Sequence, residues 1–389
     1  MIKFKISAPG RICLSGEHVA MYGKRVVVGS LNLRTTLKFV ELINKSDDFI
    51  KIDFPDVDVS LNVSWETLRN FFSINNVDRI LKNKILLLKQ VQYFITSNGM
   101  WSTYAQKFSL QIFFFLLFRI GHYEKLKVKP FHVHLTTQLT IDAGLGSSTS
   151  FAVCLAACFL HWARLQAYGT HDAFEDNDLE DISTYASLCE QVIQRYMTDF
   201  MIDNEVCTFD QVFKYMYRDP ENYIAAYVEA PEIKILLIDS KIYRNKYKQV
   251  QQMAKLKHSR FKDVNDCLDR IDEISLEIWS LLQEIAINHK NLLQRNNSFA
   301  VLQIFIRMYQ DMLFDFNMSH SNLDIICSIV RNYKFVGKLT GFGGGGFVYI
   351  LLPPNIPQKR VTNLSTQLIA QGFNVTLTNV SCNGVRIDD

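Results

Sequence analysis

The segment DAGLGSSTS, residues 142–150, combines two glycines with four hydroxyl side chains. It lies between an apolar β-like run at 131–139 and a long apolar, helix-like run at 151–165. The first turn of a helix presents unpaired backbone N–H groups and the positive end of the helix dipole. Glycine lets a ligand come close to the backbone, and hydroxyl groups add donors or metal ligands. The pattern is therefore typical of an anion site, most often for phosphate, although serine and threonine are also ordinary helix N-caps. It is not a Walker A loop, because no Gly-Lys-Ser/Thr follows at the required spacing.

Two further glycine-rich segments occur near the ends of the chain. One is APGRICLSGEHVAMYGK at 8–24, and the other is KLTGFGGGGFVYILL at 338–352, with four consecutive glycines. Glycine loses more conformational freedom on folding than any other residue, so something must offset that loss. Close approach of the backbone to a ligand is the usual reason, and tight packing between domains is the alternative.

Apolar periodicity and turn residues predict the elements that position these segments. The acidic stretch 171–181 is expected to be the solvated start of a helix that reaches about residue 195, and residues 196–221 are expected to be irregular. Strands are expected within 1–41, where glycines break several short ones, and at 49–53, 58–63, 131–139, 223–229, 233–239, 346–352 and 373–379. Helices are expected at 64–73, 85–96, 108–121, 148–165, 245–256, 262–289, 298–316, 322–332 and 357–371.

The bulk composition is that of a folded chain with a sizeable core. The 389 residues are 48% hydrophobic and 21% charged, and this length favours two domains. We place the boundary near residue 230, where no Pro/Gly/Ser linker occurs, so the domains are expected to pack tightly. The net charge of +3 argues against a protein that binds nucleic acid through charge.

Cysteine usage indicates a reducing compartment, and we expect a cytoplasmic protein. The eight cysteines are scattered without a CxxC pair, and Cys154 and Cys158 fall in an apolar helix, so we expect buried thiols and no zinc site. The N-terminus is strand-like and not a signal peptide. The most apolar run, 110–118, is too short to cross a bilayer and is expected to be a buried helix, so no membrane partner is expected.

The three glycine-rich segments, in this order, resemble the GHMP kinase superfamily of small-molecule kinases. Within it the chain most resembles the mevalonate kinase family of animals. The resemblance lies in SGEHVAMYGKRVVVGSLNLRTTL, in KLTGFGGGG, and in the supporting segments FPDVDVSLNVSW and RIDEISLEIWSLL. It covers nearly the whole chain. It implies an α+β fold of two domains: a ribosomal-S5-like α/β domain at 1–230, which binds the ATP phosphates, and a ferredoxin-like α/β domain at 231–389. The active site would lie in the cleft between them.

The resemblance implies that ATP and Mg²⁺ bind at the second and third segments. The phosphate cradle would consist of Gly144, Leu145, Gly146, Ser147, Ser148 and Thr149. Gly343 and Gly344 would cover the phosphates, and Phe342 stands there in place of a small residue. Ser148 and Glu190 would be the Mg²⁺ ligands, since a hydroxyl and one carboxylate suit this ion. The alternative for Glu190 is an ordinary solvated glutamate on a helix.

Asp203 is the expected catalytic base, because IDN at 202–204 matches the end of the family segment Pro-Ser-Gly-Val-Asp-Asn. Asp199, Phe200 and Met201 replace its proline, serine and glycine, which could move the carboxylate. Arg11 stands where mevalonate kinases carry a lysine. A cation there would keep Asp203 ionised and stabilise developing negative charge, although arginine and lysine are not equivalent. The alternative for Arg11 is a surface residue at a strand edge.

Substrate binding is expected to involve Glu17 and His18, which by resemblance approach the acceptor. Arg244 matches a family arginine at the site, and Lys246 stands where threonine is expected; Lys241 is expected to be a surface residue. His132 and His134 share a strand face without metal partners, so we expect them to be structural.

The leading hypothesis is thus an ATP-dependent kinase that phosphorylates mevalonate at its 5-hydroxyl, in isoprenoid biosynthesis. One alternative is a kinase of the same superfamily that acts on phosphomevalonate or a sugar. The other is a non-catalytic relative, which the altered residues 199–201, Arg11 and Lys246 motivate. The family also makes a homodimer possible.

Overall fold

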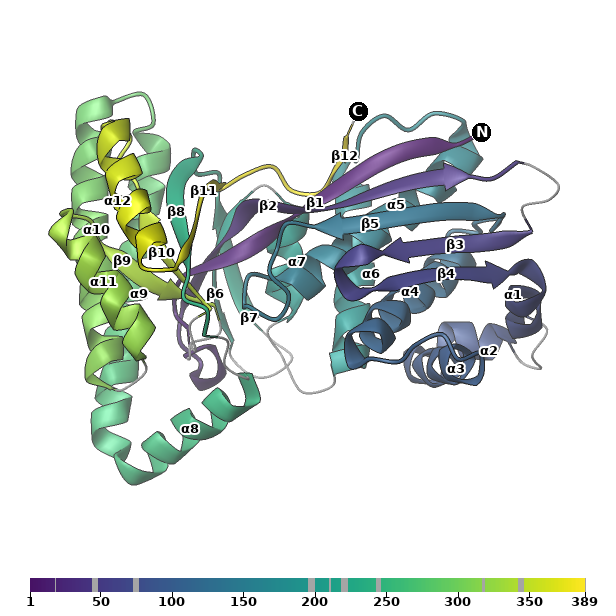
Figure 1. Cartoon of the computed structure of the whole chain (residues 1–389), viewed down its shortest axis with the longest axis horizontal. Helices are drawn as coiled ribbons and strands as arrows, with labels where there is room; N and C mark the ends of the chain where they lie inside the picture. Colours follow the sequence, from purple (N-terminus) through teal and green to yellow (C-terminus); the bar gives the residue numbers. More distant parts are fainter. Residues whose placement is uncertain are drawn as a thin grey trace.

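The computed structural model describes residues 1–17, 19–43, 48–72, 77–194, 200–209, 211–217, 223–242, 246–316, 319–341 and 346–388. Within these ranges twelve strands form one mixed sheet that runs through the molecule (Figure 1). Its main path is β4–β3–β5–β2–β11–β8–β10–β9; β1 pairs with β2 and β12, and β6 with β2 and β7. The strands are β1 (Lys3–Ser15), β2 (Val26–Glu41), β3 (Phe49–Phe54), β4 (Val59–Ser64), β5 (Phe131–Thr137), β6 (Val212–Tyr217), β7 (Tyr223–Val228), β8 (Ile233–Asp239), β9 (Gly337–Thr340), β10 (Phe347–Leu351), β11 (Asn374–Val380) and β12 (Arg386–Asp388).

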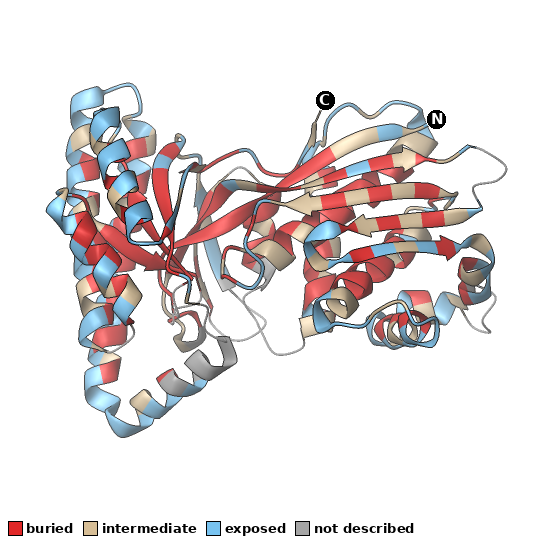
Figure 2. Ribbon diagram, in the orientation of Figure 1, coloured by how far each residue is buried: buried red, intermediate tan, exposed pale blue. Residues whose placement is uncertain are grey.

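The N-terminal half packs helices against one face of β1–β5, where alternate strand residues are apolar and buried (Figure 2). Its largest helices are apolar on most sides, since α4 and α5 lie in the middle of this core. Capping fixes the start of α4, where Thr103 and Gln106 form a capping box. The helices are α1 (Trp65–Phe72), α2 (Val77–Lys82), α3 (Lys84–Ser97), α4 (Tyr104–Tyr123), α5 (Ser147–Tyr168), α6 (Asp176–Gln194) and α7 (Phe200–Thr208).

The C-terminal half builds a second core around β8–β11. β8, β9 and β10 are largely buried, whereas β11 is mostly exposed, and the apolar faces of the amphipathic helices α9 and α11 belong to this core. The helices are α8 (Lys246–Ser259), α9 (Phe261–Ile287), α10 (Leu292–Asp315), α11 (Ser321–Asn332) and α12 (Gln358–Ala370). The two halves are continuous, because Val380 of β11 pairs with Leu31 of β2 and β12 pairs with β1. The boundary near residue 230 stays a prediction.

The mixed α+β architecture is confirmed, and so are most of the expected elements. Two expectations are wrong. Residues 1–41 form two long strands instead of several short ones, since β1 passes through Pro9 and Gly10 with a register shift. Residues 196–221 are not irregular throughout, because α7 and β6 lie there. Ile202 and Val206 of α7 pack against Phe213 and Tyr215 of β6, and this tertiary contact stabilises both elements.

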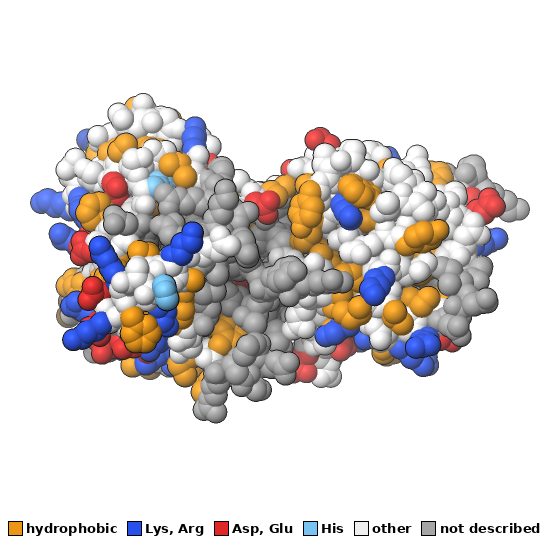
Figure 3. All heavy atoms as spheres, turned by 90° about the horizontal axis from the view of Figure 1, so that it is seen from below, with side chains coloured by type: hydrophobic (Ala, Val, Ile, Leu, Met, Phe, Trp, Pro, Cys, Tyr) orange, Lys and Arg blue, Asp and Glu red, His pale blue; other side chains and the backbone are white. Residues whose placement is uncertain are grey.

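All eight cysteines are buried free thiols, as expected. Among the described helices, α5 is long and apolar enough to span a membrane, but 83% of its most apolar window is buried inside the protein, as in a core helix. On the face that Figure 3 shows, the coloured Lys and Arg side chains are scattered among acidic and apolar ones.

Candidate functional site

The three glycine-rich segments meet in the structure. The backbone N–H of Arg11 in β1 donates to the Leu145 carbonyl at 2.9 Å, and its Nη1 donates to the Gly144 carbonyl at 3.1 Å. A side chain at Gly146 would bring Cβ to 2.6 Å from Cγ of Arg11, so only glycine fits there. Gly341 packs against the turn that contains Gly144 and Gly146, because a Cβ at Gly341 would lie 3.5 Å from Cα of Gly144. The first glycine of the third segment thus packs on the second segment.

The turn at 144–146 leaves the N-terminus of α5 without a side-chain cap. Gly144 and Gly146 have φ values of 80° and 76°, and Gly146 is the N-cap without a side-chain hydrogen bond. The alternative of a Ser or Thr N-cap is therefore wrong. Ser147, Ser148 and Thr149 instead form the first helical turn, where N–H groups and the helix dipole favour an anion.

Arg11 and Asp203 form a buried ion pair beside this turn. Nε of Arg11 lies 2.8 Å from Oδ1 of Asp203, and the two side chains are 2% and 3% exposed. Burial lowers the pKa of Arg11, but Asp203, together with the nearby Cys13 and Tyr215, opposes this effect, and the net pKa is raised. Arg11 is thus not a surface residue, and Asp203 has a fixed counter-charge despite the altered residues before it.

Glu190 of α6 is fully buried next to the first turn of α5. It accepts hydrogen bonds from Nδ2 of Asn204 at 3.0 Å, Nε2 of Gln194 at 3.3 Å and Oγ1 of Thr149 at 3.4 Å, and from the Ser148 side chain. Burial raises the pKa of Glu190 to about 7; the hydrogen bonds from Asn204, Ser148 and Thr149 oppose the rise, and nearby Asp203 adds to it. The alternative of a solvated glutamate is therefore wrong.

Glu190 and Ser148 fit a divalent cation. A buried carboxylate whose described partners are all neutral is costly in the charged form, and a cation would offset that cost. A carboxylate and a hydroxyl are also the hard oxygen donors that Mg²⁺ takes, with phosphate oxygens and water as its other ligands.

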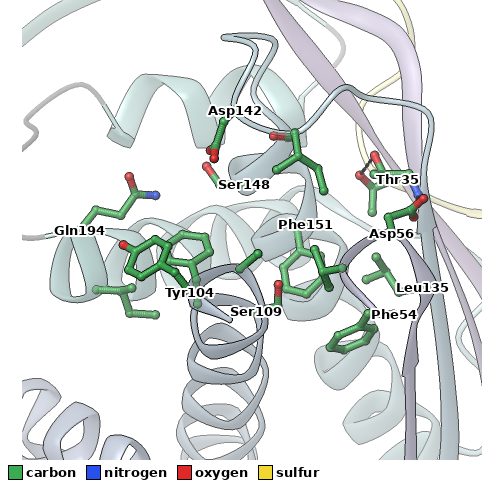
Figure 4. Close-up of a pocket in the computed structure, with 17 residues that line it drawn as sticks. Thr35, Phe54, Asp56, Tyr104, Ser109, Leu135, Asp142, Ser148, Phe151 and Gln194 are labelled. Atoms are coloured by element: carbon green, nitrogen blue, oxygen red, sulfur yellow. Dashed lines mark hydrogen bonds between the residues drawn. The ribbon is translucent and has the colours of Figure 1, made fainter. Parts of the chain in front are cut away.

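A pocket of about 360 Å³ adjoins the start of α5 (Figure 4). Phe54, Tyr104 and Phe151 supply apolar and aromatic surface, whereas Asp142 and Ser148 face each other at the end next to α5. This volume and mixed lining suit a flat, polar-edged group attached to a bound phosphate. The aromatic residues come from β3, α4 and α5, and no local sequence pattern indicates that they converge.

Glu17 lies away from solvent, with an exposed side-chain fraction of 0%. Its Oε1 is ion-paired with Nζ of Lys338 in β9, and its backbone carbonyl accepts a hydrogen bond from the Tyr309 hydroxyl at 3.0 Å. Nζ of Lys338 also lies 4.4 Å from the centre of the Tyr309 ring. Sequence reasoning missed Lys338, although it stands in the KLTG segment, because the pair joins residues far apart in the chain.

Several predicted site residues lie outside the described part of the chain: His18, Arg244, Gly343 and Gly344, as does Phe342. Lys246 is the first residue of α8, and its side chain is not described. His132 is placed as a structural residue, since its Nε2 lies 2.7 Å from Oδ2 of Asp53 on the neighbouring strand β3.

No family model matches the chain. The chain is 28% identical to mevalonate kinase of Homo sapiens over 394 residues, which cover 98% of this chain and 94% of the relative. Among solved structures, mevalonate kinase of Methanococcus jannaschii has a TM-score of 0.67 at 18% identity and covers 97% of this chain and 98% of its own. L. major mevalonate kinase in complex with R-mevalonate has a TM-score of 0.62 at 14% identity and covers 98% of this chain and 96% of its own. At these identities the two structures show a shared fold.

Proposed function

Because this chain is homologous to the mevalonate kinases along nearly its whole length, we propose that it transfers the γ-phosphoryl group of ATP to the 5-hydroxyl of mevalonate. The product is 5-phosphomevalonate, an intermediate of isoprenoid biosynthesis. The observation that carries the proposal is the buried Arg11–Asp203 pair beside the open N-terminus of α5. A proton acceptor then stands next to a phosphate site, which is what phosphoryl transfer to an alcohol requires.

In the proposed mechanism, Asp203 accepts the proton of the acceptor hydroxyl as its oxygen attacks the γ-phosphorus. Arg11 keeps the carboxylate ionised and offsets the negative charge that develops during transfer. The N–H groups of Ser147, Ser148 and Thr149 bind phosphate oxygens, together with the glycine turn before them.

Ser148 and Glu190 are the residues that would hold Mg²⁺. When bound, this ion neutralises charge on the phosphate oxygens of ATP. Gly343 and Gly344 are proposed to cover the phosphates.

The acceptor contacts are assigned to His18, Arg244 and Lys246; the positive charges of the arginine and the lysine suit a carboxylate substrate. Glu17 is buried and paired with Lys338, so we assign it to hold the turn before His18 rather than to touch the acceptor. The buried thiols support a reducing, cytoplasmic location. A homodimer is proposed from the family alone.

The test is an assay of ADP release by the purified protein with ATP, Mg²⁺ and mevalonate. Parallel reactions contain phosphomevalonate, galactose or no acceptor. Release that depends on mevalonate and is absent with the other acceptors supports the proposal. Release with phosphomevalonate or galactose alone assigns a different acceptor. A protein that binds ATP but releases ADP with none of them is a non-catalytic relative, the outcome that the altered residues 199–201 motivate.

A further inference from the structure

We infer that the C-terminal segment 381–388 is a positioning element for the reaction, which holds α7 and with it Asp203 against the strand that carries Arg11. The inference rests on the proposed function, since that function gives Asp203 its role. Three sets of contacts carry it: those of Ser30, those of Arg34 and those at the end of α7.

The segment returns from the C-terminal half to the N-terminal half (Figure 1). After β11, the Ser381 N–H donates to the Ser30 carbonyl at 3.0 Å. The Ser30 hydroxyl donates to the Cys382 carbonyl at 2.8 Å and accepts from the Cys382 N–H at 2.9 Å. β12 then pairs with residues 5–7 of β1. Hydrogen bonds thus hold the segment at one end to β2 and at the other end to β1.

Arg34 of β2 forms hydrogen bonds with the middle of the segment. Its Nη1 donates to the Asn383 carbonyl at 2.8 Å, and its Nη2 donates to the Gly384 carbonyl at 2.7 Å. The same guanidinium binds the Ser7 hydroxyl and the Ser7 carbonyl of β1, both at 2.8 Å. Arg34 is 8% exposed. A planar group with four such bonds holds the segment in one position relative to β1.

The segment 381–388 contacts Thr208, the last residue of α7. The Val385 N–H donates to the Thr208 carbonyl at 3.1 Å. A Cβ at Gly384 would lie 2.7 Å from the carbonyl carbon of Thr208 and nearer still to its oxygen, and 2.9 Å from the carbonyl carbon of Phe209. The two backbones are therefore in direct contact, and only glycine fits between them.

Thr208 is five residues after Asp203, a distance of about 7.5 Å along a helix. A short helix moves as a unit, so a shift at Thr208 reaches Asp203. The same shift would alter the 2.8 Å Arg11–Asp203 contact and the hydrogen bond from Asn204 to Glu190. Misplacement of a reacting group by about 1 Å can lower the rate roughly 100-fold.

The test compares Gly384→Ala with Gly372→Ala. The new Cβ at position 384 must move the Thr208 carbonyl or the segment by more than about 1 Å to reach ordinary van der Waals contact. At Gly372 the added Cβ would meet nothing within 4 Å, although φ is +87°, so this control carries backbone strain without touching α7. We expect kcat of Gly384→Ala to fall roughly 10- to 100-fold, with KM for ATP within about twofold of wild type. Gly372→Ala should lose thermal stability and keep its kcat.

Amide hydrogen exchange of residues 200–209 provides a readout that needs no activity. Exchange should be faster in Gly384→Ala than in wild type and unchanged in Gly372→Ala. Wild-type kcat and wild-type exchange in a folded Gly384→Ala protein would overturn the inference. If wild type does not phosphorylate mevalonate but the exchange responds as expected, the proposed function fails and the positioning contact stands. Should Gly384→Ala not fold, Arg34→Lys serves in its place, because lysine keeps the charge but cannot hold both carbonyls.

Discussion

Replacing Glu190 by glutamine is expected to stabilise the ligand-free protein at alkaline pH. The pKa of Glu190 lies at about 7 because of burial, against 4.5 for an ordinary glutamate. Each pKa unit corresponds to about 1.4 kcal/mol, so the ionised side chain costs the folded state about 3 kcal/mol above pH 7. A folded-state pKa that is raised means that the folded protein binds the proton more tightly. The cost is therefore absent below pH 4.5 and complete above pH 7. Glutamine is never charged, so it removes this cost.

The measurement is the melting temperature of wild type, Glu190→Gln and Glu180→Gln without metal or nucleotide, from pH 5 to pH 8.5. Glu180 lies exposed on the same helix and is the matched control, expected to change stability by less than about 0.5 kcal/mol. The advantage of Glu190→Gln should grow as the pH rises and level off above pH 7. It should shrink or reverse when Mg²⁺ and ATP are added, because only the carboxylate gains from the cation. A Glu190→Gln protein that melts below wild type at pH 8 without ligand would refute the reasoning.

Three more predictions concern single side chains. Asp203→Asn should abolish most turnover and leave ATP binding within about twofold, as measured by nucleotide titration; turnover within about fivefold of wild type would remove Asp203 as the base. Asp142→Asn should tighten binding of Mg²⁺-free ATP about tenfold in a titration with a chelator, since a carboxylate beside the phosphate site repels the nucleotide; unchanged affinity would place the phosphates elsewhere. Burial and the adjacent His171 lower the pKa of His161 to about 4, so its neutral form is favoured in the folded state and stability is lost as the pH falls from 6.5 towards 4. His161→Gln should remove this loss of stability at acid pH in pH-dependent melting curves. A variant that loses as much stability as wild type on acidification would contradict this role of His161.

The elements that could be predicted from the sequence are those whose own residue types indicate their conformation or burial. The apolar runs of α4 and α5 and the glycine turn at 144–146 could be placed from the sequence, because burial on all sides and a left-handed backbone each require particular residues. The helix α7 could not, because its nine residues are too few to be stable alone. It forms because Ile202 and Val206 are buried against β6.

The polar contacts between residues far apart in the chain could also not be predicted from the sequence. Lys338 and Glu17 pair across 321 residues, and Arg34 binds carbonyls 349 and 350 residues away. Carbonyl oxygens are present at every residue, so no side-chain pattern marks the ones that Arg34 binds. The NLRT run could therefore support a family resemblance without indicating what its arginine does.

The two buried carboxylates of the site differ in what balances their charge, and this difference separates their roles. Asp203 has a counter-charge in Arg11, which favours its ionised form, as its proposed role of proton acceptor requires. Glu190 is surrounded in the described part of the chain by the neutral donors of Ser148, Thr149, Gln194 and Asn204. None of these described partners carries a positive charge, so we expect binding of the proposed metal ion and relief of the burial cost to be linked. Exchanging the two environments would favour the protonated form of the proposed base and would neutralise the proposed metal ligand before a cation binds, so neither residue would suit its proposed role.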